Sequence, residues 1–177
     1  RAGNRFIAGI VVVVDRDQRV VGVLTDGDIR RGFSEGKGVT TQPRGNTGEL
    51  ITAQLLKVHG LSYNDVKMSF VSYTDSVTQM QDGHAQAFGL GTTIPAGAIM
   101  DLASARPIKV LDLSDALDGM RKLNPGYTLV TIPKGTYPKQ DKDVPAIGYT
   151  THIIAACDLP EDVVYRMTKA MAAGVND

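Results

Sequence analysis

The fold is decided by the stretch Gly38-Val39-Thr40-Thr41-Gln42-Pro43-Arg44-Gly45-Asn46-Thr47-Gly48-Glu49. Residues 38–41 predict a short strand, and the turn after them leads into a helix. Asn46 with Glu49 three residues later predicts a capping box, and Gly60 lies where a helix C-cap favours a left-handed residue. The apolar face of this helix recurs at helical spacing in Ile51, Leu55 and Val58. The stretch is therefore read as the strand–turn–helix half of a β–α–β unit.

The rest of the chain repeats this alternation. Strands are expected at 66–70, 85–90, 108–113, 127–132 and 144–156. Helices are expected at 75–81, from Pro95 to Ala103, from Ser114 to Leu123, and from a second capping box at 158–161 to Gly174. Strands that alternate with helices predict a mainly parallel sheet covered on both faces, so the expected fold class is α/β.

Length and composition fit one compact domain, or one domain and a fragment. The 177 residues are 42% hydrophobic and 21% charged, which excludes a disordered chain. Nineteen Lys and Arg balance nineteen Asp and Glu, and this net charge of zero argues against nucleic-acid binding. No apolar run approaches the roughly 20 residues that span a bilayer.

The residue pattern predicts neither a catalytic site nor a metal site. The single cysteine, Cys157, cannot form an intramolecular disulfide. It also lacks zinc-site spacing with the three histidines, which are His59, His84 and His152. No serine, histidine and acid follow one another around a nucleophile elbow. We therefore expect no metal, no cofactor and no enzymatic activity.

Several ordered stretches carry a family resemblance, among them 38–49, 60–66, 81–88, 93–95, 125–127, 132–138 and 158–165. Together they resemble the TAXI family, the extracytoplasmic solute receptors of TRAP transporters. The resemblance implies a fold of the type II periplasmic-binding-protein kind, in which two α/β lobes close on a small organic anion. Residues 37–177 would be the second lobe and the C-terminal return, without the first lobe.

Residues 1–36 carry a different resemblance. The runs 10–14 and 19–24 flank a short polar turn and predict a β-hairpin. With the following Thr25-Asp26-Gly27-Asp28 they look like the second half of a CBS motif, which implies that Thr25 and Asp28 contact a nucleotide. The alternative is structural, with Asp28 capping a short helix. We thus predict a partial CBS-like hairpin and linker over 1–36, ahead of the receptor lobe.

The turn between the first strand and its helix is the strongest candidate site. A helix N-terminus presents unpaired N–H groups and a partial positive charge, both suited to a carboxylate. Polar residues that follow the strand at 85–90 are expected at the same edge of the sheet. The alternatives are ordinary helix caps at Asn46 and at Thr92 or Thr93. The candidate ligand-binding residues are Gln42, Arg44, Gly45, Asn46, Thr47, Thr92 and Thr93.

The resemblance implies extracytoplasmic, periplasmic binding of an anion such as glutamate or 2-oxoglutarate, for a TRAP membrane permease. A lone lobe exposes the surface that faces its partner, so we expect a homo-oligomer. Two alternatives stay open, a CBS-type adenine-nucleotide module and a fused or truncated chain without native activity. The chain begins at Arg1 with no signal peptide, which is expected of a fragment.

Overall fold

The computed structural model describes the backbone of residues 7–13 and all of residues 38–174. Its strands are β1 (Ile7–Val13), β2 (Gly38–Thr41), β3 (Lys67–Phe70), β4 (Ala87–Thr93), β5 (Thr128–Ile132) and β6 (Val144–Tyr149). Its α-helices are α2 (Thr47–Val58), α3 (Tyr73–Gln81), α4 (Gly97–Ala105), α5 (Leu117–Leu123) and α6 (Glu161–Ala173). Two 3-10 turns, η1 (Tyr63–Asp65) and η2 (Ser114–Ala116), complete the described elements. The chain divides into two compact units between Thr150 and Thr151, so α6 and the sheet belong to different units.

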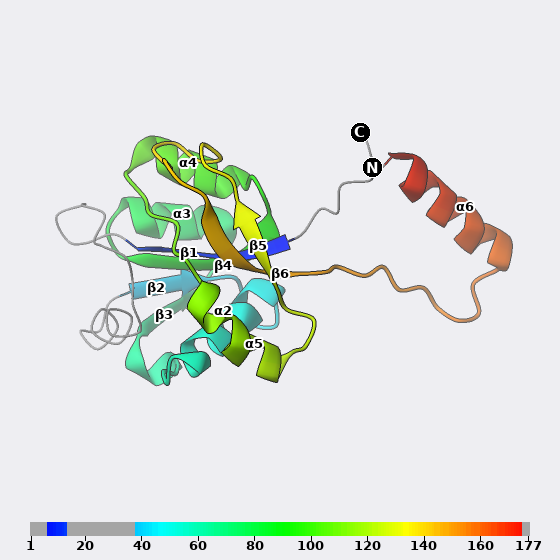
Figure 1. Cartoon of the computed structure of the whole chain (residues 1–177), viewed down its shortest axis with the longest axis horizontal. Helices are drawn as coiled ribbons and strands as arrows, with labels where there is room; N and C mark the ends of the chain where they lie inside the picture. The colour runs from blue at the N-terminus through cyan, green and yellow to red at the C-terminus, as the bar shows by residue number, and fades with distance from the viewer. Residues whose placement is uncertain (1–6, 14–37, 175–177) are drawn as a thin grey trace. The chain divides into compact units, whose positions relative to one another are not determined.

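The described strands form one sheet in the order β3-β2-β4-β1-β6-β5 (Figure 1). β2 pairs in parallel with β3 and β4, whereas β1 is antiparallel to both β4 and β6, and β5 is antiparallel to β6. β3, β2, β4 and β6 therefore point the same way, and β1 and β5 point the other way. The α/β class with a mainly parallel strand direction is confirmed.

β1 lies in the middle of the sheet. Its register places Ile7 opposite both Thr93 of β4 and Tyr149 of β6. The strand predicted at 10–14 is thus confirmed as a strand, but it begins three residues earlier, at Ile7. Its predicted hairpin partner, residues 19–24, lies outside the described residues. A strand from residues 1–36 therefore joins the same sheet as the strands of residues 37–177.

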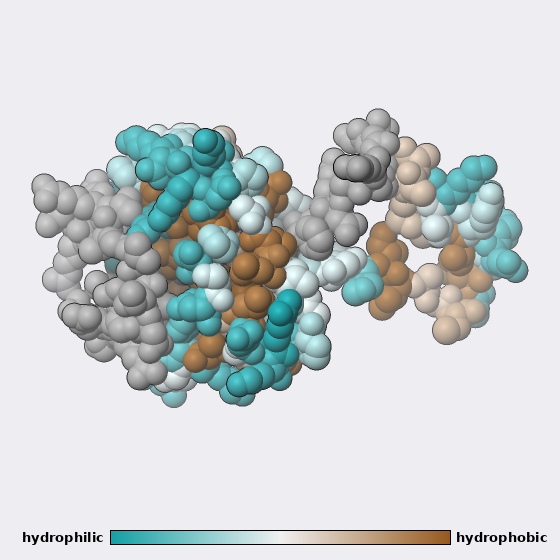
Figure 2. Space-filling view, viewed as in Figure 1, coloured by the Kyte–Doolittle hydropathy of each residue, from teal (hydrophilic) through white to brown (hydrophobic). Residues whose placement is uncertain are grey.

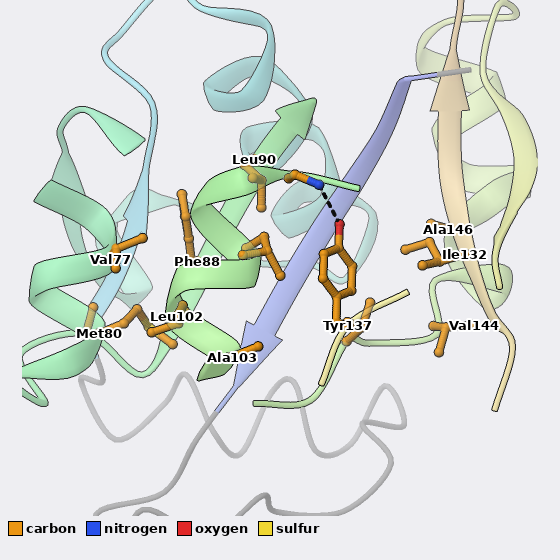
Figure 3. Packing of buried hydrophobic residues seen from close by; sticks show 14 residues of the cluster. Val77, Met80, Phe88, Leu90, Leu102, Ala103, Ile132, Tyr137, Val144 and Ala146 are labelled. Atoms are coloured by element: carbon orange, nitrogen blue, oxygen red, sulfur yellow. Dashed lines mark hydrogen bonds between the residues drawn. The ribbon is translucent and has the colours of Figure 1, made fainter. Parts of the chain in front are cut away.

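Helices cover both faces of the sheet, with α3 and α4 on one face and α2 and α5 on the other (Figure 1). Strand alternation divides the apolar side chains between two cores. Phe88 and Leu90 point toward α3 and α4, and the neighbouring Ala87 belongs to the core under α2 and α5. The first core also holds Met80, Leu102, Ile132, Val144 and Tyr137, drawn in Figure 3.

Two predicted strands differ from the structure. Residues 108–113 form no strand beyond a single bridge at Val110, although Val110, Leu111 and Leu113 are buried. An apolar run of this length is equally suited to an extended segment packed on a core, and the Leu113 amide bonds only to the Pro145 carbonyl at the strand edge. The strand predicted over 144–156 ends at Tyr149, where the chain leaves the sheet.

The expected helix caps are largely wrong. Asn46 occupies the N-cap of α2 without a side-chain hydrogen bond, and α6 begins after Pro160 with no cap from Asp158. At α4 the N-cap is Ala96, because β4 extends through Thr92 and Thr93. At the start of η2, Asp112 Oδ1 accepts hydrogen bonds from the amide and the hydroxyl of Ser114. Gly60 is confirmed in the left-handed region, with φ +71°.

Candidate functional site

Three strand ends meet at one edge of the sheet. β2 ends at Thr41 and β4 ends at Thr93, and both run in the same direction. Tyr149 ends β6 level with Thr93, because both lie opposite Ile7. We call this side, with the 42–48 turn and the N-terminus of α2, the carboxyl edge. Ligands of open α/β sheets bind outside this edge, which makes it the candidate site of this fold.

Two glycines allow the turn and β4 to approach each other closely. A Cβ on Gly48 would lie 2.8 Å from the Gly91 nitrogen, and one on Gly91 would lie 2.7 Å from the Tyr149 hydroxyl. Glycine is therefore required for backbone contact between the start of α2 and the end of β4. The Gly48 amide donates to Gln42 Oε1 at 2.9 Å, which fixes the turn against the helix.

The first turn of α2 keeps two backbone donors for a ligand. Gln42 accepts from Gly48, Glu49 Oε2 accepts from the Gly45 amide at 3.3 Å, and the Asn46 amide bonds to Pro43. Within the described residues the amides of Thr47 and Glu49 have no acceptor. Two free N–H groups in the first turn of a helix can donate to the oxygens of a carboxylate.

Buried hydroxyls hold the strands beneath this turn. Thr41 Oγ1 donates to the Gly89 carbonyl at 2.8 Å and lies 3.0 Å from Thr52 Oγ1. Thr40 Oγ1 lies 2.7 Å from Ser76 Oγ on the other face. These hydrogen bonds connect β2 to β4, α2 and α3 below the edge. The turn therefore rests on a rigid base, which is a condition for a preorganised binding site.

Tyrosines add polar groups beside Thr92. Tyr73 donates to the Gly91 carbonyl at 2.9 Å. Burial raises the pKa of Tyr73, and a side-chain hydrogen bond from Thr92 opposes that rise. Burial, and then the neighbouring Tyr73 and Tyr127, raise the pKa of Tyr149 to about 12. Tyr149 is thus a neutral donor at physiological pH, and its hydroxyl makes no hydrogen bond to another described residue.

Arg44 lies on the other side of β2. Its guanidinium carbon is 4.1 Å from the centre of the Phe70 ring and 5.6 Å from that of Tyr63. Tyr63 in turn donates to Glu49 Oε1 at 2.6 Å, and burial together with this bond raises the pKa of Tyr63. Arg44 belongs to the 42–48 turn before α2, but stacking holds its guanidinium group over Phe70 of β3.

The predicted site residues fall into two groups. Gln42 and the 45–48 turn meet Gly91 of β4, whereas Thr92 lies beside Tyr73 of α3, Arg44 faces β3 and Thr93 is exposed at the strand end. Tyr149 was missed, because only strand pairing brings it to this edge. The predicted nucleotide residues Thr25 and Asp28 lie outside the described residues.

Within residues 7–13 and 38–174, no group of His, Cys, Asp or Glu side chains could hold a metal ion. No described helix has the length and apolar character needed to cross a membrane. The edge offers neutral donors, Arg44 and one acid, Glu49, whose carboxylate accepts hydrogen bonds from the Gly45 amide and the Tyr63 hydroxyl. Such a set suits recognition of an anion by hydrogen bonding.

Sequence comparison matches residues 27–174 to the NMT1-like family. The chain belongs to the NMT1-like family. The match covers β2 to α6 and starts inside the segment predicted to precede the receptor lobe. The family match does not test the TAXI resemblance or the CBS resemblance. Both therefore stay predictions.

Two solved structures of binding proteins align with this NMT1-like chain. The periplasmic aliphatic sulphonate binding protein SsuA from Escherichia coli aligns with a TM-score of 0.52 and 16% identity, over 93% of this chain and 42% of that one. A TctC solute binding protein from Polaromonas, without ligand, aligns with a TM-score of 0.48 and 14% identity, over 98% and 54%. The chain thus spans about half the length of these proteins. The likeness to SsuA shows the fold of a periplasmic binding protein.

Proposed function

We propose that this chain is the ligand-binding lobe of a periplasmic receptor that presents a small organic anion to a TRAP-type membrane permease. Membership of the NMT1-like family and the fold shared with SsuA support a solute-binding role. The TAXI resemblance adds the transporter class and the ligand class, an acidic amino acid or dicarboxylate such as glutamate or 2-oxoglutarate. Binding without chemistry is consistent with an edge that carries neutral donors.

The observation that carries the proposal is the pair of free amides at Thr47 and Glu49. A carboxylate placed there would accept two N–H bonds and meet the positive end of the α2 dipole. Gln42 Nε2 has no acceptor among the described residues and could donate to the same ligand. Tyr149 would add a hydroxyl from β6. The proposed ligand-binding residues are Gln42, Arg44, Gly45, Asn46, Thr47, Thr92 and Thr93, with Tyr149 added.

Affinity for this chain alone should be weak. The dipole contributes only about 0.3–1 kcal/mol to an exposed carboxylate, whereas association costs at least about 4 kcal/mol. One lobe leaves one side of the ligand in water. We therefore expect a millimolar dissociation constant, which rises with added salt because the charge is screened.

A titration followed through backbone amide NMR signals tests the proposal. Glutamate and 2-oxoglutarate should shift the amides of Thr47, Gly48 and Glu49. Tyr149→Phe should weaken binding, and the matched control Tyr73→Phe should not, because the Tyr73 hydroxyl already donates within the protein. Shifts caused by AMP alone, and abolished by Asp28→Ala, would replace the proposal with the nucleotide alternative.

Self-association is a separate prediction. α6 exposes Val164, Tyr165, Met167 and Met171, and Ile154 before it is 91% exposed. On this C-terminal segment brown apolar surface lies beside teal polar surface (Figure 2). Apolar side chains in water favour association. Sedimentation should show oligomers at high micromolar concentration, and a monomer there would contradict the prediction.

A further inference from the structure

A second polar feature lies at the opposite edge of the sheet. Segment 107–110 and the loop 133–143 enclose a cavity of about 350 Å³. Its apolar wall includes Ile108, Val110 and Val144. Val144 begins β6, whereas Tyr149 ends it at the carboxyl edge, so about 17 Å of extended chain separates the two places. We call this side the amino edge.

The cavity combines this apolar wall with positive charge. Lys109, Lys139 and Lys142 line it, against a single acid, Asp141. Lys139 and Lys142 are exposed, and Lys109 is half-buried. Ammonium groups around a concave apolar surface attract an anion whose body is apolar. The volume falls in the range of small-molecule pockets, about 300–1,000 Å³.

Gln140 fixes the loop that carries two of these lysines. Its Nε2 donates to the carbonyls of Ile132, Pro133 and Lys142 at 3.0–3.2 Å, and its Oε1 accepts from the Tyr137 amide at 3.3 Å. The loop is therefore held from within by one side chain. Lysines on a held loop lose less freedom on binding than lysines on a mobile one.

Lys139 has a backbone conformation that glycine would adopt more easily. Its φ is +65°, which is in the left-handed region. A side chain there costs about 1–2 kcal/mol relative to the ordinary regions. The neighbouring turn in the same loop uses glycine, Gly135, at φ +77°. A lysine at this position is thus explained better by the charge it brings to the cavity than by the stability of the loop.

We propose that the amino-edge cavity is a second binding site, for a small amphiphilic anion: a carboxylate or phosphate attached to an aromatic or branched aliphatic body. Lys139 and Lys142 would pair with the anionic group, and the wall around Val110 would cover the apolar body. The site is separate from the carboxyl edge and goes beyond the proposed receptor function.

The test is a titration of the full chain with phenyl phosphate and with benzoate, followed by amide NMR. Both should shift the amides of Val110, Lys139 and Lys142 and leave Thr47 in place. Inorganic phosphate should bind more weakly, because it cannot use the apolar wall. Lys139→Gln with Lys142→Gln should raise the dissociation constant of phenyl phosphate about tenfold, from the loss of two screened charges.

Matched variants distinguish specific binding in the cavity from a general effect of the protein's positive charge. Lys57→Gln with Lys122→Gln removes the same charge from exposed positions elsewhere and should change binding less than twofold. Lys139→Gly should raise the urea midpoint of unfolding while weakening phenyl phosphate binding. The proposal is overturned if the two double variants bind alike, or if the shifts lie outside the cavity.

Discussion

The two edges of the sheet use their polar groups differently. At the carboxyl edge most donors already have acceptors within the chain, as in the bond from Gly48 to Gln42, and two backbone amides are left. At the amino edge the loop satisfies its backbone through Gln140 and leaves its charged side chains exposed. If both proposals hold, the carboxyl edge recognises an anion through directed hydrogen bonds, and the amino edge recognises one through charge.

Gly48→Ala should have the largest effect, and it acts on the carboxyl edge alone. A Cβ there contacts the Gln42 carboxamide and lies 2.8 Å from the Gly91 nitrogen, so backbone must move. We expect a loss of about 3 kcal/mol in the free energy of unfolding, measured by urea titration. Gly97→Ala is the control, because nothing lies within 4 Å of its Cβ. Equal losses in the two variants would contradict the close approach.

Tyr137→Phe tests whether the edges are independent. Tyr137 belongs to the amino-edge loop, and its buried hydroxyl accepts from the Ala96 amide beyond β4 at 3.1 Å (Figure 3). Phenylalanine keeps the ring and leaves a buried N–H unpaired, which costs about 1–3 kcal/mol. Urea unfolding should show this loss. Amide shifts in the variant that spread from Lys139 to Thr92 would show that the edges are coupled.

The alkaline pH dependence of stability should include a contribution from Tyr149. Burial raises the pKa of Tyr149 to about 12 from 10.0, so the folded state keeps the proton that the unfolded state loses first. Its contribution is complete below pH 10 and is lost as pH rises toward 12. Tyr149→Phe should reduce this alkaline loss by about 1 kcal/mol after allowance for solvent. An unchanged alkaline profile in urea titrations at pH 9 and pH 11.5 would show that Tyr149 is not buried at the edge.

Gln42→Glu should have the smallest effect on stability and the clearest effect on binding. A carboxylate can still accept from the Gly48 amide, and at the start of α2 it gains about 0.3–1 kcal/mol from the helix dipole. The same charge repels an anionic ligand. We expect a slightly raised unfolding midpoint and no detectable glutamate binding in calorimetry. Retained binding would place the ligand away from the turn.

The sequence predicts the elements of this fold better than their contacts. β2, α2 and β4 follow from local periodicity, and Gly60 from the left-handed C-cap. The place of β1 between β4 and β6 does not, because strand pairing between distant segments leaves no local pattern. Residues 108–113 are apolar enough for a strand, but the structure packs them beside η2 as an extended segment.

The sequence predicts where the turn before α2 lies in the fold but not the contacts of its side chains, and the binding site itself stays a prediction. A glycine-containing turn before a helix marks the carboxyl edge, whereas the choice of Gln42 over Asn46 as the acceptor depends on side-chain geometry. Tyr149 reaches the edge only through its register with β1. The cavity at the amino edge depends on the shape of a loop, and its lysines are unremarkable in the sequence.

Glutamate binding to Thr47→Pro and Thr47→Ala tests the central claim most directly. Thr47 is the first residue of α2, where proline is favoured, and Asn46 before it is extended at φ −81° and ψ 154°, as proline requires. Both variants lose the hydroxyl, and only proline loses the amide donor. The account predicts that both fold and that Thr47→Pro binds glutamate about tenfold more weakly than Thr47→Ala. Equal affinities would contradict an anion site at the start of α2.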